Sequence, residues 1–74
     1  MAFVNVRVVG GVLDRTEKQR LIEGITDLVV EVQGKGDEDF EQYCWVIVDE
    51  SEPGMLGVGG QGLTTEDVKQ AQGG

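Results

Sequence analysis

The first nine residues alternate in polarity with a period of two, which is typical of a β-strand with one face on a core. One face is β-branched and consists of Val4, Val6 and Val8. The other face mixes apolar and polar side chains and consists of Phe3, Asn5, Arg7 and Val9. A strand that starts at residue 2 also keeps the amino terminus close to ordered structure.

The next apolar positions recur with the period of a helix. Asp14 and Glu17 have the spacing of a capping box, so a helix is expected to start after Asp14 and to run to about Val32. Gly34 fits the position after its C-cap. The apolar stripe is interpreted as core and consists of Leu21, Ile22, Ile25, Leu28, Val29 and Val32.

Residues 34–42 are polar and predict a connecting loop. Its acidic run, Asp37 to Asp39, is interpreted as solvated, and no second acidic cluster supports the alternative of a metal site. Phe40 is expected to anchor this loop on the sheet. Residues 43–48 are apolar on both faces, as in a buried central strand. A strand, helix and strand of these lengths predict a right-handed βαβ unit with parallel strands.

The remaining residues are rich in glycine. Pro53 and Gly54 suit the central positions of a turn. The run Gly57-Val58-Gly59-Gly60 lacks the Lys-Ser/Thr of a phosphate loop, so a hairpin or a close approach to another subunit is expected instead. Residues 64–68 can start a short helix, and a frayed tail is expected for 69–74. The predicted organisation is one domain over residues 1–63 and a C-terminal tail over 64–74.

Composition narrows the class of protein. A chain of 74 residues is marginal as a monomer, and with Cys44 alone it cannot form an intrachain disulfide, so oligomerisation is expected. Cys44 is interpreted as a small apolar residue rather than a nucleophile. The net charge of −8 argues against nucleic acid and anionic membranes as partners. No metal or cofactor is expected, and the absence of a signal peptide or apolar span suggests the cytoplasm.

These features together resemble the tautomerase superfamily, and in particular small subunits of the 4-oxalocrotonate tautomerase type. The matching segments are Phe3 to Val8, the helix with Leu21-Ile22 and Ile25-Thr26, Trp45 to Glu50, and Gly57 to Gly60. The resemblance covers about residues 2–63. It implies an α/β fold of β-α-β type with parallel strands and a short C-terminal hairpin, assembled as trimers or as hexamers of dimers. A dimer of this kind would have a four-stranded sheet.

The resemblance also implies an isomerase that interconverts keto and enol forms of an unsaturated 2-oxo acid. In that family an amino-terminal proline is the base, and neighbouring subunits complete the active site. Here the proline position holds Ala2, and the two arginine positions fall at Val12 or Leu13 and at Trp45. The hairpin phenylalanine position holds Leu56. At the four positions that usually carry the family's chemistry, this sequence therefore has other residues.

Several residues remain candidates for a site around a small anionic substrate. Ala2 can offer a primary amine once Met1 is removed, either as a base or for imine formation. The candidate substrate-binding residues are Arg7, Phe3, Val9, Trp45, Leu56 and Val58. Instead of binding a substrate anion, Arg7 could form an ion pair at a subunit interface. Instead of stacking on a substrate, Trp45 could be an aromatic residue of the core or of an interface. Arg15 and Arg20 either reach a neighbour's site or form a solvated helix face.

Two functions follow from these observations. The first is a weak tautomerase, impaired because Ala2 replaces the proline base. The second is a non-catalytic subunit of the same fold, partnered by itself or by a paralogous tautomerase chain that supplies the missing groups.

Overall fold

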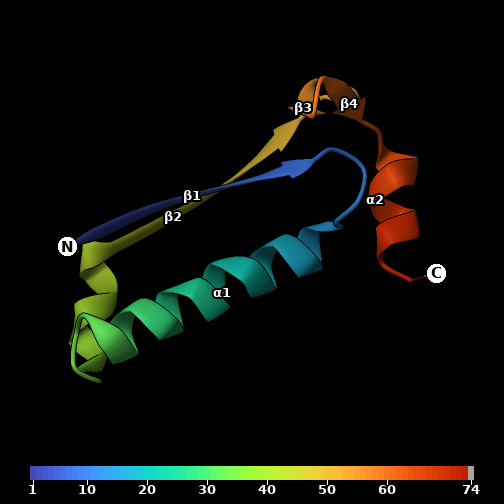
Figure 1. The fold of residues 1–74 in the computed structure, drawn as a ribbon. Helices are drawn as coiled ribbons and strands as arrows, with labels where there is room; N and C mark the ends of the chain where they lie inside the picture. Colours follow the sequence, from blue (N-terminus) through green and yellow to red (C-terminus); the bar gives the residue numbers. More distant parts are fainter. Residues whose placement is uncertain (74) are drawn as a thin grey trace.

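Residues 1–73 are described in a computed structural model of the chain, and they form a β-α-β unit followed by a hairpin and a short helix (Figure 1). In chain order the elements are β1 (Ala2–Val9), α1 (Arg15–Val32), the 3-10 helix η1 (Glu38–Tyr43), β2 (Cys44–Ser51), β3 (Leu56–Val58), β4 (Gln61–Leu63) and α2 (Thr65–Ala71). β1 and β2 pair in parallel from Ala2↔Cys44 to Val9↔Ser51. The predicted β-α-β fold with parallel strands and a hairpin is therefore confirmed.

Helix α1 begins and ends as the sequence predicts. The Asp14 carboxylate accepts a hydrogen bond from the backbone N–H of Glu17 at 2.8 Å, and the Glu17 carboxylate accepts one from the N–H of Asp14 at 3.0 Å. Gly34 follows the C-cap Gln33, but the positive φ angles lie at Lys35 and Gly36. Gly34 is instead needed for space, since a Cβ there would lie 2.7 Å from the Cβ of Phe40.

The connection after α1 is more ordered than the predicted loop. It contains η1, and the Asp37 carboxylate caps this helix by accepting a hydrogen bond from the N–H of Asp39 at 3.0 Å. Phe40 packs against Gly34 at the end of α1, and its ring centroid lies 5.7 Å from that of Tyr43. Phe40 therefore anchors η1 on α1, whereas the sequence led us to expect a contact with the sheet.

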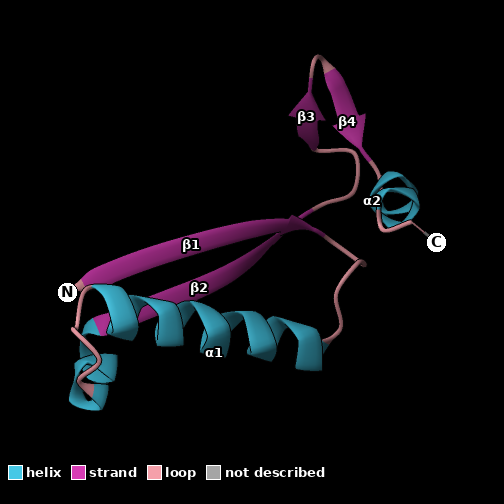
Figure 2. Cartoon of the chain, turned by 60° about the horizontal axis from the view of Figure 1, so that its bottom comes forward, coloured by secondary structure: helices cyan, strands magenta, loops and turns pink. Residues whose placement is uncertain are grey.

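Strand β2 is covered on one face only. Helix α1 packs mainly against β2 on one side of the sheet (Figure 2). On the opposite side Trp45 is 50% exposed and Ile47 is 40% exposed. The prediction of a strand buried on both faces is thus wrong for a single chain, because one helix covers only one face of a two-stranded sheet.

The chain has very little core of its own. Among residues 1–73, Val9 and Val30 are the buried apolar side chains. The surface area is 5418 Å², whereas a compact monomer of this mass exposes about 4,500 Å². The radius of gyration is 14.8 Å, against about 11 Å for a compact chain of this length. Much apolar surface is therefore left for contacts with another molecule.

The predicted stripe of α1 is only partly buried. Leu28 and Val32 are 58% and 63% exposed, so their assignment to the core of one chain is wrong. They lie on the flank of the helix rather than on the side that packs against β2. Gly24, in the middle of α1, is also exposed, and glycine at such a position costs ~0.5–1 kcal/mol relative to alanine.

The C-terminal elements extend beyond the ends of β1 and β2 (Figure 1). Gly54, at φ 86°, occupies the turn predicted with Pro53, and Gly59-Gly60 joins β3 to β4 in the predicted hairpin. Helix α2 starts at the predicted place, with Thr64 as its N-cap. It continues through Lys69 to Ala71, so the expected fraying is wrong there, and Gly74 lies outside the described residues.

Candidate active site

Ala2, the candidate catalytic position, opens β1 at the mouth of an apolar groove. The groove has a volume of about 340 Å³ and is lined by Ala2, Leu28, Val29, Val32 and Gln33. Ala2 pairs with Cys44 in the parallel ladder, and both residues are half-buried. Met1 precedes Ala2 and is 70% exposed, so the end of the chain is open to solvent.

Phe3 and Trp45 form an apolar patch on the opposite face of the sheet. They are paired in the ladder and are 64% and 50% exposed. Since successive side chains of a strand point to opposite faces, this patch does not line the groove beside Ala2. The two surfaces meet only at the start of β1.

Arg7 lies on the same open face, but its charge already has a partner. Its guanidinium Nη2 is 3.7 Å from Oδ2 of Asp49, and the side-chain amide of Asn5 donates a hydrogen bond to that oxygen at 2.8 Å. Arg7 is also five residues from Ala2 along an extended strand, which is a distance of about 16 Å. One small substrate cannot touch both residues of one chain.

The other predicted wall residues lie at the far end of the molecule. Val9 is 5% exposed, and Leu56 and Val58 belong to β3 of the hairpin. Val9 is about 23 Å from Ala2 along β1. The structure therefore places Phe3 and Trp45 at the same end of the sheet as Ala2 but on its other face. Arg7, Val9, Leu56 and Val58 lie too far away to share a site with Ala2 in one chain.

Sequence reasoning missed the groove residues on α1. Leu28, Val29, Val32 and Gln33 line the space beside Ala2. The helical period places Leu28, Val29 and Val32 in an apolar stripe about 120° wide, which is ordinary for a single face against a core. The sequence therefore carried no signal that separates these residues from core residues.

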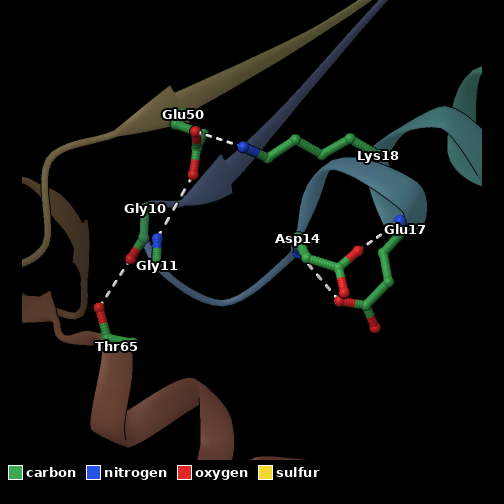
Figure 3. A network of polar contacts seen from close by, with 7 residues as sticks. All are labelled: Gly10, Gly11, Asp14, Glu17, Lys18, Glu50 and Thr65. Atoms are coloured by element: carbon green, nitrogen blue, oxygen red, sulfur yellow. Dashed lines mark hydrogen bonds and ion pairs between the residues drawn. The ribbon is translucent and has the colours of Figure 1, made fainter.

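A polar network joins the other ends of β1 and β2 to both helices (Figure 3). The Glu50 carboxylate accepts hydrogen bonds from Nζ of Lys18 and, at 3.3 Å, from the N–H of Gly11. The Thr65 hydroxyl donates to the carbonyl of Gly10 at 2.7 Å, which ties α2 to the loop after β1. The Lys18 ammonium and the Gly11 N–H hold the pKa of Glu50 below its ordinary value of 4.5.

Two further observations concern ligands and membranes. Within residues 1–73, no three His, Cys, Asp or Glu side chains are grouped in a way that could hold a metal ion. The same part of the chain contains no helix with the length and apolar character needed to span a membrane. Cys44 is a free, half-buried thiol.

Comparison with known proteins identifies the family. The family model described as "Tautomerase enzyme" matches residues 3–66. The chain is 36% identical over 64 residues to "Probable tautomerase K2" of Dickeya dadantii, covering 86% of this chain and 90% of that protein. The chain belongs to the tautomerase family. A "Probable tautomerase" of Helicobacter pylori is 35% identical over 65 residues, covering 85% of this chain and 90% of that protein.

Solved structures agree with this tautomerase assignment. The crystal structure of DmpI from Helicobacter pylori matches with a TM-score of 0.70 at 35% identity, covering 82% of this chain and 94% of that chain. YwhB, described as a homologue of 4-oxalocrotonate tautomerase, matches with a TM-score of 0.65 at 25% identity, covering 88% and 95%. The chain is thus a 4-oxalocrotonate tautomerase-like member of the tautomerase family.

Replacing Glu50 by glutamine should destabilise this tautomerase chain in a pH-dependent way. The unfolded chain binds a proton at Glu50 at higher pH than the folded chain does, so ionised Glu50 stabilises the fold above about pH 4.5. Urea unfolding should show a wild-type advantage at pH 7 that shrinks as the pH falls through the lowered pKa. The exposed Glu52→Gln is the control. A constant difference between pH 7 and pH 3 would contradict the role of the ionised carboxylate.

Proposed function

We propose that the chain is a weak tautomerase that interconverts the keto and enol forms of an unsaturated 2-oxo acid. The observation that carries this proposal is the position of Ala2 at the mouth of the apolar groove, in a chain of the tautomerase family. Removal of Met1 would leave the α-amine of Ala2 at the start of β1. Ala2 then takes the place of the family's amino-terminal proline.

The amine acts as a general base. It takes the hydroxyl proton of the enol and returns a proton to carbon, so the proton moves from oxygen to carbon with no net change in composition. Apolar surroundings disfavour the ammonium form of an amine. The side chains of Leu28, Val29 and Val32 supply such surroundings beside Ala2.

Substrate contacts are completed by neighbouring subunits of a homotrimer or homohexamer. Phe3 and Trp45 form an apolar wall at the same end as Ala2. A neighbour contributes Arg7 for the substrate carboxylate, and Val9, Leu56 and Val58 as further walls. Asp49 offsets the charge of Arg7, so anion binding is poor and the rate is low.

The second candidate function is a non-catalytic subunit, alone or partnered with a paralogous catalytic tautomerase chain. Two observations favour a non-catalytic subunit: Arg7 is paired with Asp49, and alanine stands at position 2 in place of the family's proline. Such a chain would contribute its fold and its interfaces, and the partner would contribute the base and the arginines.

Intact mass and an enol assay distinguish the two functions. Mass spectrometry establishes whether Met1 is absent, and phenylenolpyruvate and 2-hydroxymuconate then serve as substrates. We expect slow ketonisation above the buffer rate that is lost after carbamylation of the α-amine with cyanate. Activity that survives carbamylation would exclude the amine as base, and no activity on either substrate would favour the non-catalytic function.

A further inference from the structure

The groove beside Ala2 has a lining without charge. The amino terminus and the last turns of α1 lie at the same end of the molecule (Figure 1), and the groove between them has a volume of about 340 Å³. Four of its lining residues are apolar, namely Ala2, Leu28, Val29 and Val32, and the fifth is Gln33. None of the five can neutralise a carboxylate. The groove therefore suits a ligand that is uncharged.

The charges near the groove are negative. Asp27 and Glu31 directly precede Leu28 and Val32 in α1, and the whole chain has a net charge of −8. Both the local and the overall field disfavour an anion in the groove. Arg7 does not compensate for this within the chain, because it lies about 16 Å along β1 from Ala2 and is paired with Asp49.

The α-amine of Ala2 differs chemically from the amine of an amino-terminal proline. Once Met1 is removed it is a primary amine, which can add to the carbonyl carbon of an aldehyde or ketone. The resulting carbinolamine loses water to form a C=N bond, and both amine hydrogens leave with the former carbonyl oxygen. Proline has only one hydrogen on nitrogen and would form a charged iminium. An apolar groove favours the neutral imine that alanine allows.

We propose that the α-amine of Ala2 forms an imine with an aldehyde or ketone whose uncharged, apolar chain lies in the groove. The exposed side chains of Leu28 and Val32, at 58% and 63%, supply the surface that such a chain would cover. The side-chain amide of Gln33 supplies the one polar group beside the amine. The proposal rests on the proposed function for the removal of Met1, but it requires no turnover of an enol and names a different class of ligand.

Reductive trapping with cyanoborohydride tests the imine. The protein is first treated with methionine aminopeptidase, and intact mass confirms that Met1 is absent. Butanal and octanal are then compared, and peptide mapping measures the rate of alkylation at each amine. Each buried methylene group strengthens binding about fourfold, so trapping at Ala2 should be at least about tenfold faster with octanal. The exposed Lys35 and Lys69 are internal references and should show no such preference.

Charge on the ligand provides a second comparison in the same protein. An analogue of octanal that ends in a carboxylate should alkylate Ala2 at least about tenfold more slowly than octanal does, because nothing in the groove neutralises the carboxylate. Equal rates for butanal and octanal at Ala2 would overturn the proposal, and so would a preference for the carboxylate. Neither comparison depends on a variant.

Val32→Asn tests the groove wall. Val32 is exposed in the chain, so the substitution should leave the helix content by circular dichroism unchanged, and it should bring the octanal-to-butanal ratio at Ala2 close to one. Ile47→Asn, on the other face of the sheet, is the matched control and should keep the wild-type ratio. A folded Val32→Asn protein with the wild-type ratio would contradict binding in the groove.

The outcomes separate this proposal from the tautomerase function. A protein that ketonises enols but traps no aldehyde at Ala2 would use its amine only as a base, and the imine proposal would be wrong. A protein that traps octanal in preference to butanal but does not ketonise enols would support the imine site and favour the non-catalytic function. The two assays therefore fail independently.

Discussion

Replacing Ala2 by proline, in protein whose Met1 has been removed, should raise enol ketonisation at least about tenfold. The groove walls and the apolar patch of Phe3 and Trp45 are already present, so the missing part is the base. General-base catalysis typically contributes about 10²–10⁴-fold. The gain should stay near the lower end of that range, because Arg7 is paired with Asp49 and transition-state charge is poorly stabilised.

The control for this substitution is Ala2→Ser, which keeps a primary amine at the same place and should match the wild type. kcat and KM should be measured for phenylenolpyruvate and 2-hydroxymuconate, after intact mass has confirmed the amino terminus. In the proline background, Arg7→Ala should lower kcat/KM further if a neighbour's Arg7 reaches the substrate. An Ala2→Pro protein no faster than Ala2→Ser would show that the pocket lacks more than its base, and the non-catalytic function would then be preferred.

At micromolar concentration the chain should sediment at three or six times its mass of 8.0 kDa. Two buried apolar side chains cannot offset the conformational entropy of 73 ordered residues, so the fold depends on contacts between chains. The exposed aromatic and aliphatic side chains of the sheet and the hairpin are available for such contacts, and they include Phe3, Trp45, Ile47, Met55 and Val58.

The same dependence should appear in thermal unfolding. Association stabilises the folded chain by mass action, and each tenfold dilution lowers this stabilisation by about 1.4 kcal/mol for each partner bound, so the midpoint should fall as the protein is diluted. Circular dichroism at several concentrations, paired with sedimentation, measures this. A midpoint that does not depend on concentration, together with a single 8.0 kDa species, would contradict oligomer-dependent folding.

Local patterns in the sequence were sufficient for the elements of the fold. The capping box at Asp14 and Glu17, the turn at Pro53-Gly54 and the alternation in β1 each depend on neighbouring residues, and each prediction is confirmed. Features that depend on contacts between residues far apart in the chain were harder to predict from the sequence. Gly34 is a glycine because Phe40 lies against it, and no spacing rule along the chain reveals that contact.

The candidate site could be predicted only by analogy. Ala2 was singled out from a family resemblance, whereas the groove beside it is formed by α1 residues that the helical pattern assigned to the core. Periodicity distinguishes apolar from polar faces, but it does not tell whether an apolar face is covered by the same chain or by another. Leu28 and Val32 follow the core pattern and are nevertheless exposed.

The scarcity of buried side chains also affects how the protein reaches its folded state. β1 and β2 pair residues 42 positions apart, as in Ala2↔Cys44, so the sheet must close a long loop before it gains stability. Among residues 1–73 the buried apolar side chains are those of Val9 and Val30, so a lone chain gains little by closing that loop. Collision between chains then becomes part of the folding reaction. Refolding should follow second-order kinetics at low concentration, and newly made subunits should survive proteolysis in proportion to how quickly they meet one another.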